Sequence, residues 1–174
     1  MNDIEQLLQA IRAFQEAGID FVVIGGLALR AHGANNFTTD VDFAYAVSTE
    51  NTERLAAFLP LIQARVLGRP INDHFVITPE TLQKSRFLNL KTKFGSVDVM
   101  REIPGVDSFE ALRERAIPID LGGFVVPIAS LDDLITMKRA ANRPKDQSHL
   151  YELLALKKLI EAEATTTGEL LESE

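Results

Sequence analysis

The sequence predicts a mixed α and β fold, either α/β or α+β, in which helices pack on a mixed sheet. Apolar runs typical of buried strands alternate with segments whose apolar residues recur at helical spacing. Two further pairs of short strand-like segments flank glycine-containing turns, which is typical of β-hairpins. Strands that are interleaved with helices and also joined in hairpins indicate a sheet with both parallel and antiparallel pairs.

The first quarter of the chain predicts two helices and two strands. Apolar residues recur every three or four positions over 4–17, and Gly18 is placed to end that helix. The run 21–24 is apolar throughout, as in a strand buried on both faces. A short helix over 27–32 and a strand over 41–47 follow.

The next segment predicts a long helix and a loop. Ser48 or Thr49 is placed to cap a helix that runs to about Val66. After a turn-rich connection, an extended piece is predicted over 74–77, and Pro79 is suited to the first position of a helical turn.

Two hairpins and a helix between them are predicted next. The segments 87–91 and 96–100 alternate cleanly around a turn, as do 117–120 and 124–127 around a Gly-Gly pair. Ser108 is placed to cap the intervening helix, which is expected to end at about Arg115.

The C-terminal part predicts two more helices. Ser130, followed by Asp133 three positions later, is similar to a capping box, and Pro144 is expected to break the helix that they open. Asp146 then stands at the expected N-cap of the final helix. The predicted organisation is one domain in three parts: a core over 1–129, a helical element over 130–162 and an acidic, disordered tail over 163–174.

Composition narrows the classes of protein and site. The chain has no cysteine, so disulfides and thiolate zinc sites are excluded. The net charge of −7 argues against a general nucleic-acid coat, although basic residues cluster locally. No apolar run approaches the ~20 residues that span a bilayer, and the N-terminus lacks a signal-peptide pattern. We therefore expect a cytoplasmic protein with no membrane partner.

The stretch 21–43 carries the most informative chemistry of the chain. Gly25 and Gly26 follow the apolar strand directly and open a helix-like run. A lone Gly-Gly pair usually marks a tight turn. In this context, a backbone without side chains also lets a phosphate approach the unpaired N–H groups of a helix N-terminus.

Three acids add a candidate metal site to this stretch. Asp40 and Asp42 lie two positions apart on a predicted strand, so their side chains share a face. An isolated Asp-x-Asp pair is usually a solvated strand end, but two fixed carboxylates also repel each other and are readily held by Mg²⁺. Asp98, on the second arm of a predicted hairpin, offers a third ligand. Metal-dependent phosphoryl or nucleotidyl transfer uses such an arrangement.

Three segments together resemble the polymerase-β-type nucleotidyltransferase superfamily, namely 23–43, 87–100 and 134–154. Within it, the chain is most similar to the minimal bacterial nucleotidyltransferases of the AbiEii kind, a group that includes toxins of toxin–antitoxin pairs. The third segment, LITMKRAANRPKDQSHLYEL, is similar to the lysine-bearing helix and Arg-x-Lys-Asp element of that group. The resemblance implies the nucleotidyltransferase fold, a twisted mixed sheet packed by helices and followed by a short C-terminal helical element.

The resemblance also implies roles for individual residues. Asp40 and Asp42 would hold two Mg²⁺ ions, and Asp98 would complete the metal nearer the attacking hydroxyl and accept its proton. The implied nucleotide-binding residues are Gly25, Gly26, Thr38 and Lys138, and the implied acceptor-binding residues are Arg143, Lys145 and Asp146. For Asp146, a helix cap and an active-site residue both remain open.

Two positions depart from the family pattern. Gly26 stands where related proteins often carry Ser, and Asn36 stands where the subgroup often carries Arg. These departures leave open a catalytically degenerate protein that only binds.

The expected activity is Mg²⁺-dependent transfer of a nucleoside monophosphate from an NTP to a hydroxyl of an acceptor. The acceptor would be an RNA, such as a tRNA end, or a protein, and the enzyme would be a toxin with a cognate antitoxin. The alternatives are an antibiotic-type enzyme that modifies a small molecule and a degenerate binding protein of the same fold.

Overall fold

A computed structural model describes residues 3–35, 37–70 and 73–171, without the side chains of Asp3, Lys145 and 163–171. Its centre is a seven-stranded mixed sheet in the order β3-β4-β5-β2-β1-β7-β6. The pairs β2–β5 and β1–β7 are parallel and the other neighbours are antiparallel. The strands are β1 (Phe21–Ile24), β2 (Asp40–Tyr45), β3 (Arg65–Val66), β4 (Phe87–Thr92), β5 (Gly95–Met100), β6 (Ile117–Asp120) and β7 (Val125–Ile128). The predicted fold class is confirmed.

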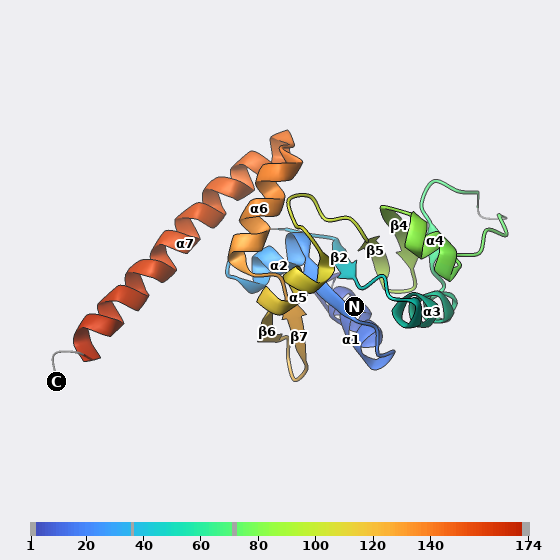
Figure 1. Cartoon of the computed structure of the whole chain (residues 1–174), viewed down its shortest axis with the longest axis horizontal. Helices are drawn as coiled ribbons and strands as arrows, with labels where there is room; N and C mark the ends of the chain where they lie inside the picture. The colour runs from blue at the N-terminus through green and yellow to red at the C-terminus, as the bar shows by residue number, and fades with distance from the viewer. Residues whose placement is uncertain (1–2, 36, 71–72, 172–174) are drawn as a thin grey trace.

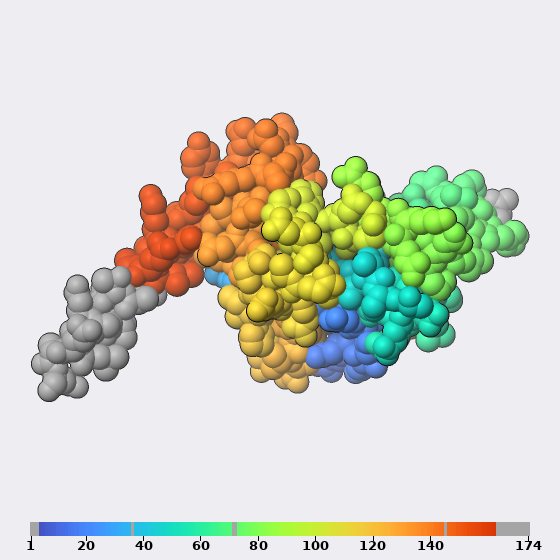
Figure 2. All heavy atoms as spheres, viewed as in Figure 1, coloured from blue at the N-terminus to red at the C-terminus, as the bar shows by residue number. Residues whose placement is uncertain are grey.

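Helices connect and cover these strands, and the last one extends away from them. They are α1 (Asp3–Glu16), α2 (Gly25–Ala31), α3 (Thr49–Phe58), α4 (Pro79–Lys84), α5 (Phe109–Arg115), α6 (Leu131–Ala141) and α7 (Pro144–Leu171), with a 3₁₀ turn at Leu59–Ile62. α7 projects from one end of the molecule, and α3, α4 and β4 lie at the other (Figure 1). The space-filling view has the same elongated outline (Figure 2). Within the described residues, no helix is long and apolar enough to cross a membrane.

The main hydrophobic core lies between one face of the sheet and the helices that pack on it. Phe14 of α1 stacks on Phe43 of β2 with ring centroids 4.1 Å apart, and Phe21 and Phe58 meet the Phe14 ring edge-on. Phe43 is fully buried and alternates along β2 with residues on the opposite face. The core therefore fixes the orientation of β2 and leaves its other face for polar chemistry.

The long helix predicted to reach Val66 is wrong. α3 ends at Phe58, and a 3₁₀ turn that contains Pro60 follows, because proline lacks the N–H that a continuing α-helix needs. Gln63 follows in the left-handed region at φ 57°, which reverses the chain and frees Arg65–Val66 to pair as the edge strand β3. The extended piece expected over 74–77 is not paired as a strand.

The start of the last helix also differs from the prediction. Asn142, in the left-handed region at φ 44°, ends α6, and Pro144 is the first residue of α7. Asp146 is therefore in the first turn of α7 rather than at its N-cap. α7 continues as helix to Leu171, and the expected disordered tail over 163–174, like the proposed three-part division, stays a prediction.

Candidate active site

The three predicted acids lie together on the face of the sheet opposite the main core. Asp40 and Asp42 alternate along β2 with the fully buried Val41. β2 pairs in parallel with β5 so that Asp42 and Asp98 are register partners. Neighbouring strands lie about 4.8 Å apart, so these two carboxylates come from adjacent positions on one face. The predicted convergence from two neighbouring strands is confirmed.

The Asp42 carboxylate packs directly against the backbone of the Gly25-Gly26 pair. Gly25 has φ +67°, and a Cβ built on it would lie 1.9 Å from Oδ2 of Asp42. The backbone N–H of Gly26 donates a hydrogen bond to the Asp42 carboxylate. Any side chain at Gly25 would therefore displace this carboxylate, which explains the glycine without any appeal to a ligand.

The crowding of carboxylates is visible in the acidity of Asp42. Burial raises its pKa, and the charges of Asp40 and Asp98 raise it further, to about 7, against the opposing effects of the Gly26 hydrogen bond and Lys138. A cation placed among these oxygens would relieve both the burial penalty and the repulsion.

The carboxylate oxygens at the site are suited to a hard cation, although they are not arranged as a complete set of metal ligands. Within the part of the chain that the structure describes, no three acidic or histidine side chains already form a metal-binding cluster. Asp40 and Asp42 nevertheless supply adjacent carboxylates, which are the donors that Mg²⁺ prefers. The charge of Asp98 acts on Asp42, and Asp98 lines the same cleft, so a third donor is close to the same site.

Thr38 orients one of these acids. Its hydroxyl donates to Oδ1 of Asp40 at 2.7 Å and also lies 3.1 Å from the Asp40 backbone oxygen. Thr38 lines the same cleft as the acids. Its hydrogen bond assigns it to positioning Asp40, whereas its predicted contact with a nucleotide stays a prediction.

Lys138, Arg143 and Asp146 form one ion-pair cluster. Lys138 Nζ lies 2.7 Å from Oδ1 of Asp146, and Arg143 Nε lies 2.8 Å from its Oδ2. Burial acts to raise the pKa of Asp146, but hydrogen bonds from Arg143 and Lys138 outweigh it and lower the value to about 2. Asp146 is 1% exposed, so it anchors both cations from behind.

This cluster brings together residues to which the family resemblance assigns different roles, nucleotide binding and acceptor binding. Lys138 is expected at the nucleotide and Arg143 at the acceptor, yet both line one cleft. Asp146, for which a cap and an active-site residue are both open, is the common partner of both cations. The side chain of Lys145 and all of Asn36 lie outside the described residues.

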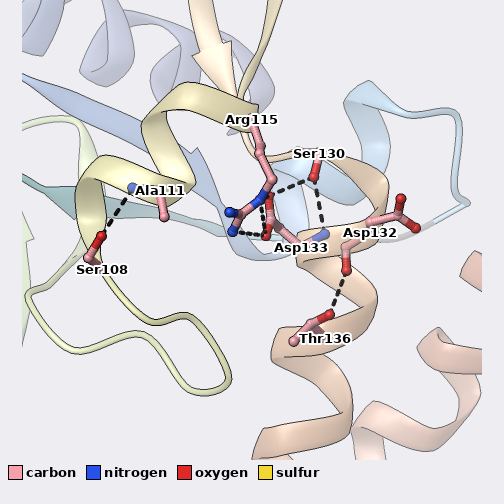
Figure 3. Close-up of polar contacts among 7 residues, drawn as sticks. All are labelled: Ser108, Ala111, Arg115, Ser130, Asp132, Asp133 and Thr136. Carbon is pink, nitrogen blue, oxygen red and sulfur yellow. Dashed lines mark hydrogen bonds and ion pairs between the residues drawn. The ribbon is translucent and has the colours of Figure 1, made fainter.

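A second polar cluster fixes the helix that carries Lys138 (Figure 3). Arg115 at the end of α5 donates from Nε and a terminal nitrogen to the 5%-exposed Asp133. Ser130 accepts the Asp133 backbone N–H at 3.1 Å and donates to its carboxylate at 2.7 Å. The Ser130–Asp133 spacing predicts this cap, but nothing local to it indicates Arg115 as the partner.

The cleft that contains the acids and cations has a volume of about 850 Å³. Sequence reasoning missed much of its wall, because these residues come from distant segments and carry no motif. The missed lining residues include Phe37, Phe87, Asn89, Pro104 and His149. Phe37 and Phe87 are large, exposed hydrophobic residues, and such residues are a recognisable signal for binding once the fold is known.

Solved structures share this fold at low sequence identity. The lincosamide antibiotic adenylyltransferase LnuA, solved with lincomycin bound, matches with a TM-score of 0.59 at 12% identity, over 87% of this chain and 96% of that chain. The antibiotic-resistance factor ANT(2'')-Ia, in complex with adenylyl-2''-tobramycin, matches with a TM-score of 0.54 at 16% identity, over 94% and 91%. A putative nucleotidyltransferase from Thermotoga maritima matches with a TM-score of 0.50 at 18% identity, over 96% and 93%.

Comparison by sequence identifies the family. No curated protein matches the chain. The family model described as "Nucleotidyl transferase AbiEii toxin, Type IV TA system" matches residues 6–171, which is nearly the whole sequence. Together with the nucleotidyltransferase fold and the acids on β2 and β5, this match places the chain in the AbiEii family of nucleotidyl transferase toxins.

Proposed function

We propose that this nucleotidyltransferase is Mg²⁺-dependent and moves a nucleoside monophosphate from an NTP to a hydroxyl of an acceptor. The observation that carries the proposal is the placement of Asp40, Asp42 and Asp98 beside the Gly25-Gly26 backbone in one large cleft. Lys138 lines the same cleft and adds positive charge where phosphates would lie.

Asp40, Asp42 and Asp98 are the residues that would hold Mg²⁺. When bound, the ion supplies positive charge that stabilises the developing charge on phosphate and hydroxyl oxygens. Thr38 keeps the Asp40 carboxylate in place through its hydroxyl. Asp98, the third acid, is the group assigned to accept the proton of the attacking hydroxyl.

The remaining residues would bind and orient the NTP. The side-chain-free backbone of Gly25 and Gly26 allows phosphates to approach closely. Lys138 would attract them as a compact charge. Asp146 keeps the Lys138 ammonium directed by an ion pair, which limits the orientations that this flexible side chain can adopt.

An RNA or protein acceptor is proposed, and the toxin family favours it. A partner antitoxin is proposed on the same ground. The second candidate is a small-molecule acceptor. Its support is the fold that the chain shares with enzymes solved with adenylyl-2''-tobramycin and with lincomycin. The sequence identities of 16% and 12% establish a common fold and not a common substrate. A catalytically degenerate protein, suggested by Gly26 and Asn36, is the third.

The test is transfer of label from each α-³²P-labelled NTP, with Mg²⁺, to three separate fractions: total cell RNA, RNase-treated cell protein and a small-molecule extract. Label in RNA or protein supports the leading proposal, and label in small molecules supports the second. Chelation with EDTA is expected to abolish transfer, and added Mg²⁺ to restore it. No label in any fraction would favour the degenerate protein.

A matched pair of variants assigns any transfer to this site. Asp98→Asn keeps the shape of the side chain and removes one of the three charges. Asp107→Asn makes the same change at an exposed acid outside the cleft. Transfer is expected to be lost in the first and kept in the second; equal activity in both would remove the site from the proposal.

A further inference from the structure

The face of the sheet that carries the acids continues past them to the edge of the sheet. Along β4, Phe87 and Asn89 line the large cleft, and Lys91, two positions further, lines a smaller groove. Residues at this spacing on a strand share a face. Asn89 is the register partner of Asp98, so β4 links the acid site to that groove.

This groove is lined by residues of β3, the edge strand of the sheet, which pairs with β4. β4 lies at the same end of the molecule as α3 and α4 (Figure 1). A hollow of about 210 Å³ on one side is lined by Arg65, Arg69 and Lys91, among others. A second hollow of about 290 Å³ is lined by Arg65, Lys91 and Lys93. We call these two hollows together the edge groove.

Arg65 and Lys91 stand directly opposite each other in the β3–β4 ladder, between the two hollows. Like charges at opposed positions of an antiparallel pair are destabilising. Both residues are exposed, and among the described residues no acidic group lies within ion-pair distance of either. The whole protein has a net charge of −7, yet none of the acidic side chains that the structure describes forms an ion pair with Arg65 or Lys91.

The other charged groups of the edge groove are partly satisfied. Arg69 pairs with Asp73 at 2.5 Å and lies over the ring of Phe75. Lys93 donates to the backbone oxygen of Leu61 at 3.2 Å. Arg65 and Lys91 are therefore the cations that the fold leaves to attract an anion from solution.

Protection against edge-to-edge association does not explain the pair. Charged side chains on an edge strand do prevent such association. A cation facing an anion would serve that purpose equally well and would also stabilise the ladder. Two opposed cations become a favourable pair when an anion binds between them and neutralises their repulsion.

We propose that the edge groove binds the phosphate backbone of a single-stranded RNA acceptor, whose end then crosses β4 and β5 to the acids. Three strand spacings, or roughly 14 Å, separate β3 from β2, so the ligand must be an extended polyanion rather than one phosphate. Phe87, exposed on the same face, offers a surface on which an unpaired base can stack. This inference rests on the proposed function and selects the class of its acceptor.

The test measures RNA binding separately from transfer. Fluorescence anisotropy of a fluorescein-labelled RNA of about 16 nucleotides, the upper end of a typical single-strand site, is followed across a salt series. Arg65→Ala/Lys91→Ala is expected to bind about tenfold more weakly and to lower the slope of log K against log salt by about 1.4, for two phosphate contacts. Its affinity for a non-hydrolysable NTP analogue, measured by calorimetry, should not change.

The matched control is Lys84→Ala/Lys158→Ala, which removes the same charge from positions of α4 and α7 outside the edge groove. It is expected to bind the RNA like the wild type, as is the charge-preserving Arg65→Lys/Lys91→Arg. Wild-type binding by Arg65→Ala/Lys91→Ala, or an equal loss in the control, would overturn the inference. Label transfer to RNA that persists in Arg65→Ala/Lys91→Ala would do so too, while leaving the proposed function intact.

Discussion

Gly25 and Asp42 show how closely single residues constrain each other at the site. Two separate features of Gly25 exclude a side chain: its positive φ, and the distance of only 1.9 Å that would separate an added Cβ from Oδ2 of Asp42. Gly33 has a positive φ of 96°, but among the described residues no atom would lie within 4 Å of a Cβ added there. A side chain at Gly33 would therefore strain the backbone without a steric clash. The two glycines therefore separate backbone strain from crowding.

Gly25→Ala is expected to lower the free energy of unfolding by more than Gly33→Ala, whose cost should be about 1–2 kcal/mol. The excess at Gly25 arises because its methyl group must displace the Asp42 carboxylate. Urea unfolding of both variants measures the difference. Equal destabilisation would show that Asp42 moves aside freely, and the close approach would then have no structural consequence.

Asp40→Asn is expected to abolish transfer and to leave the metal-free protein as stable as the wild type, or more stable. The charge of Asp40 acts against ionised Asp42, so its removal relieves repulsion in the folded state. Transfer assays and thermal unfolding in EDTA provide the two measurements. A clear fall in melting temperature would instead assign Asp40 a structural role through its bond with Thr38.

At the scale of elements, α6 is held at both ends by ion pairs to other helices. Arg115 of α5 fixes its first turn through Asp133, and Asp146 of α7 fixes Lys138 near its last. The position of Lys138 in the cleft therefore depends on three helices. Such long-range pairs leave no periodic signal in the sequence.

The α6–α7 connection should respond to acid in a defined window. Asp146 has a pKa of about 2 in the folded protein, below its ordinary value of 3.8, so its ion pairs stabilise the fold above about pH 4. At pH 7, Asp146→Asn is expected to cost about 2 kcal/mol of unfolding free energy. That difference should shrink between about pH 4 and pH 2, as the wild-type carboxylate takes up its proton. Denaturant titrations of both proteins at several pH values test this, and a difference independent of pH would contradict the ion-pair assignment.

Lys138→Ala is expected to weaken binding of a non-hydrolysable NTP analogue with Mg²⁺, because it removes a charge that lies beside the acids. Arg143→Ala combined with Lys145→Ala should keep that affinity and lose transfer to a nucleic-acid acceptor. Calorimetry and the transfer assay measure the two properties. Because Arg143 and Lys138 share Asp146, normal nucleotide binding by Lys138→Ala together with loss in the double variant would reverse the two assignments.

At the scale of the whole molecule, the sequence predicts what short-range patterns encode. Strand β1, the two hairpins and the caps at Ser108 and Ser130 are recognisable because each depends on residues only a few positions apart. The acids on β2 and β5 are predictable because alternation and one family pattern locate them.

Features formed between distant segments cannot be predicted in the same way. The edge strand β3 is only two residues long and depends on pairing with β4, so its own sequence is too short to show the alternation that predicts a strand. The contact between Asp146 and Lys138 requires knowledge of how α7 turns back on α6. The aromatic cleft wall likewise combines Phe37, which precedes β2, with Phe87 of β4, and these residues are about 50 positions apart in the sequence.

The parallel pairing of β2 with β5 also sets when the enzyme becomes able to act during its own synthesis. No short turn can join these strands, so Asp42 meets Asp98 only after the long intervening chain has emerged from the ribosome and been placed. Lys138 and Asp146 follow later still, in the last quarter of the sequence. A chain translated only as far as β5 therefore lacks a complete site, and for a toxin this ordering delays activity until α6 and the start of α7 have also been made.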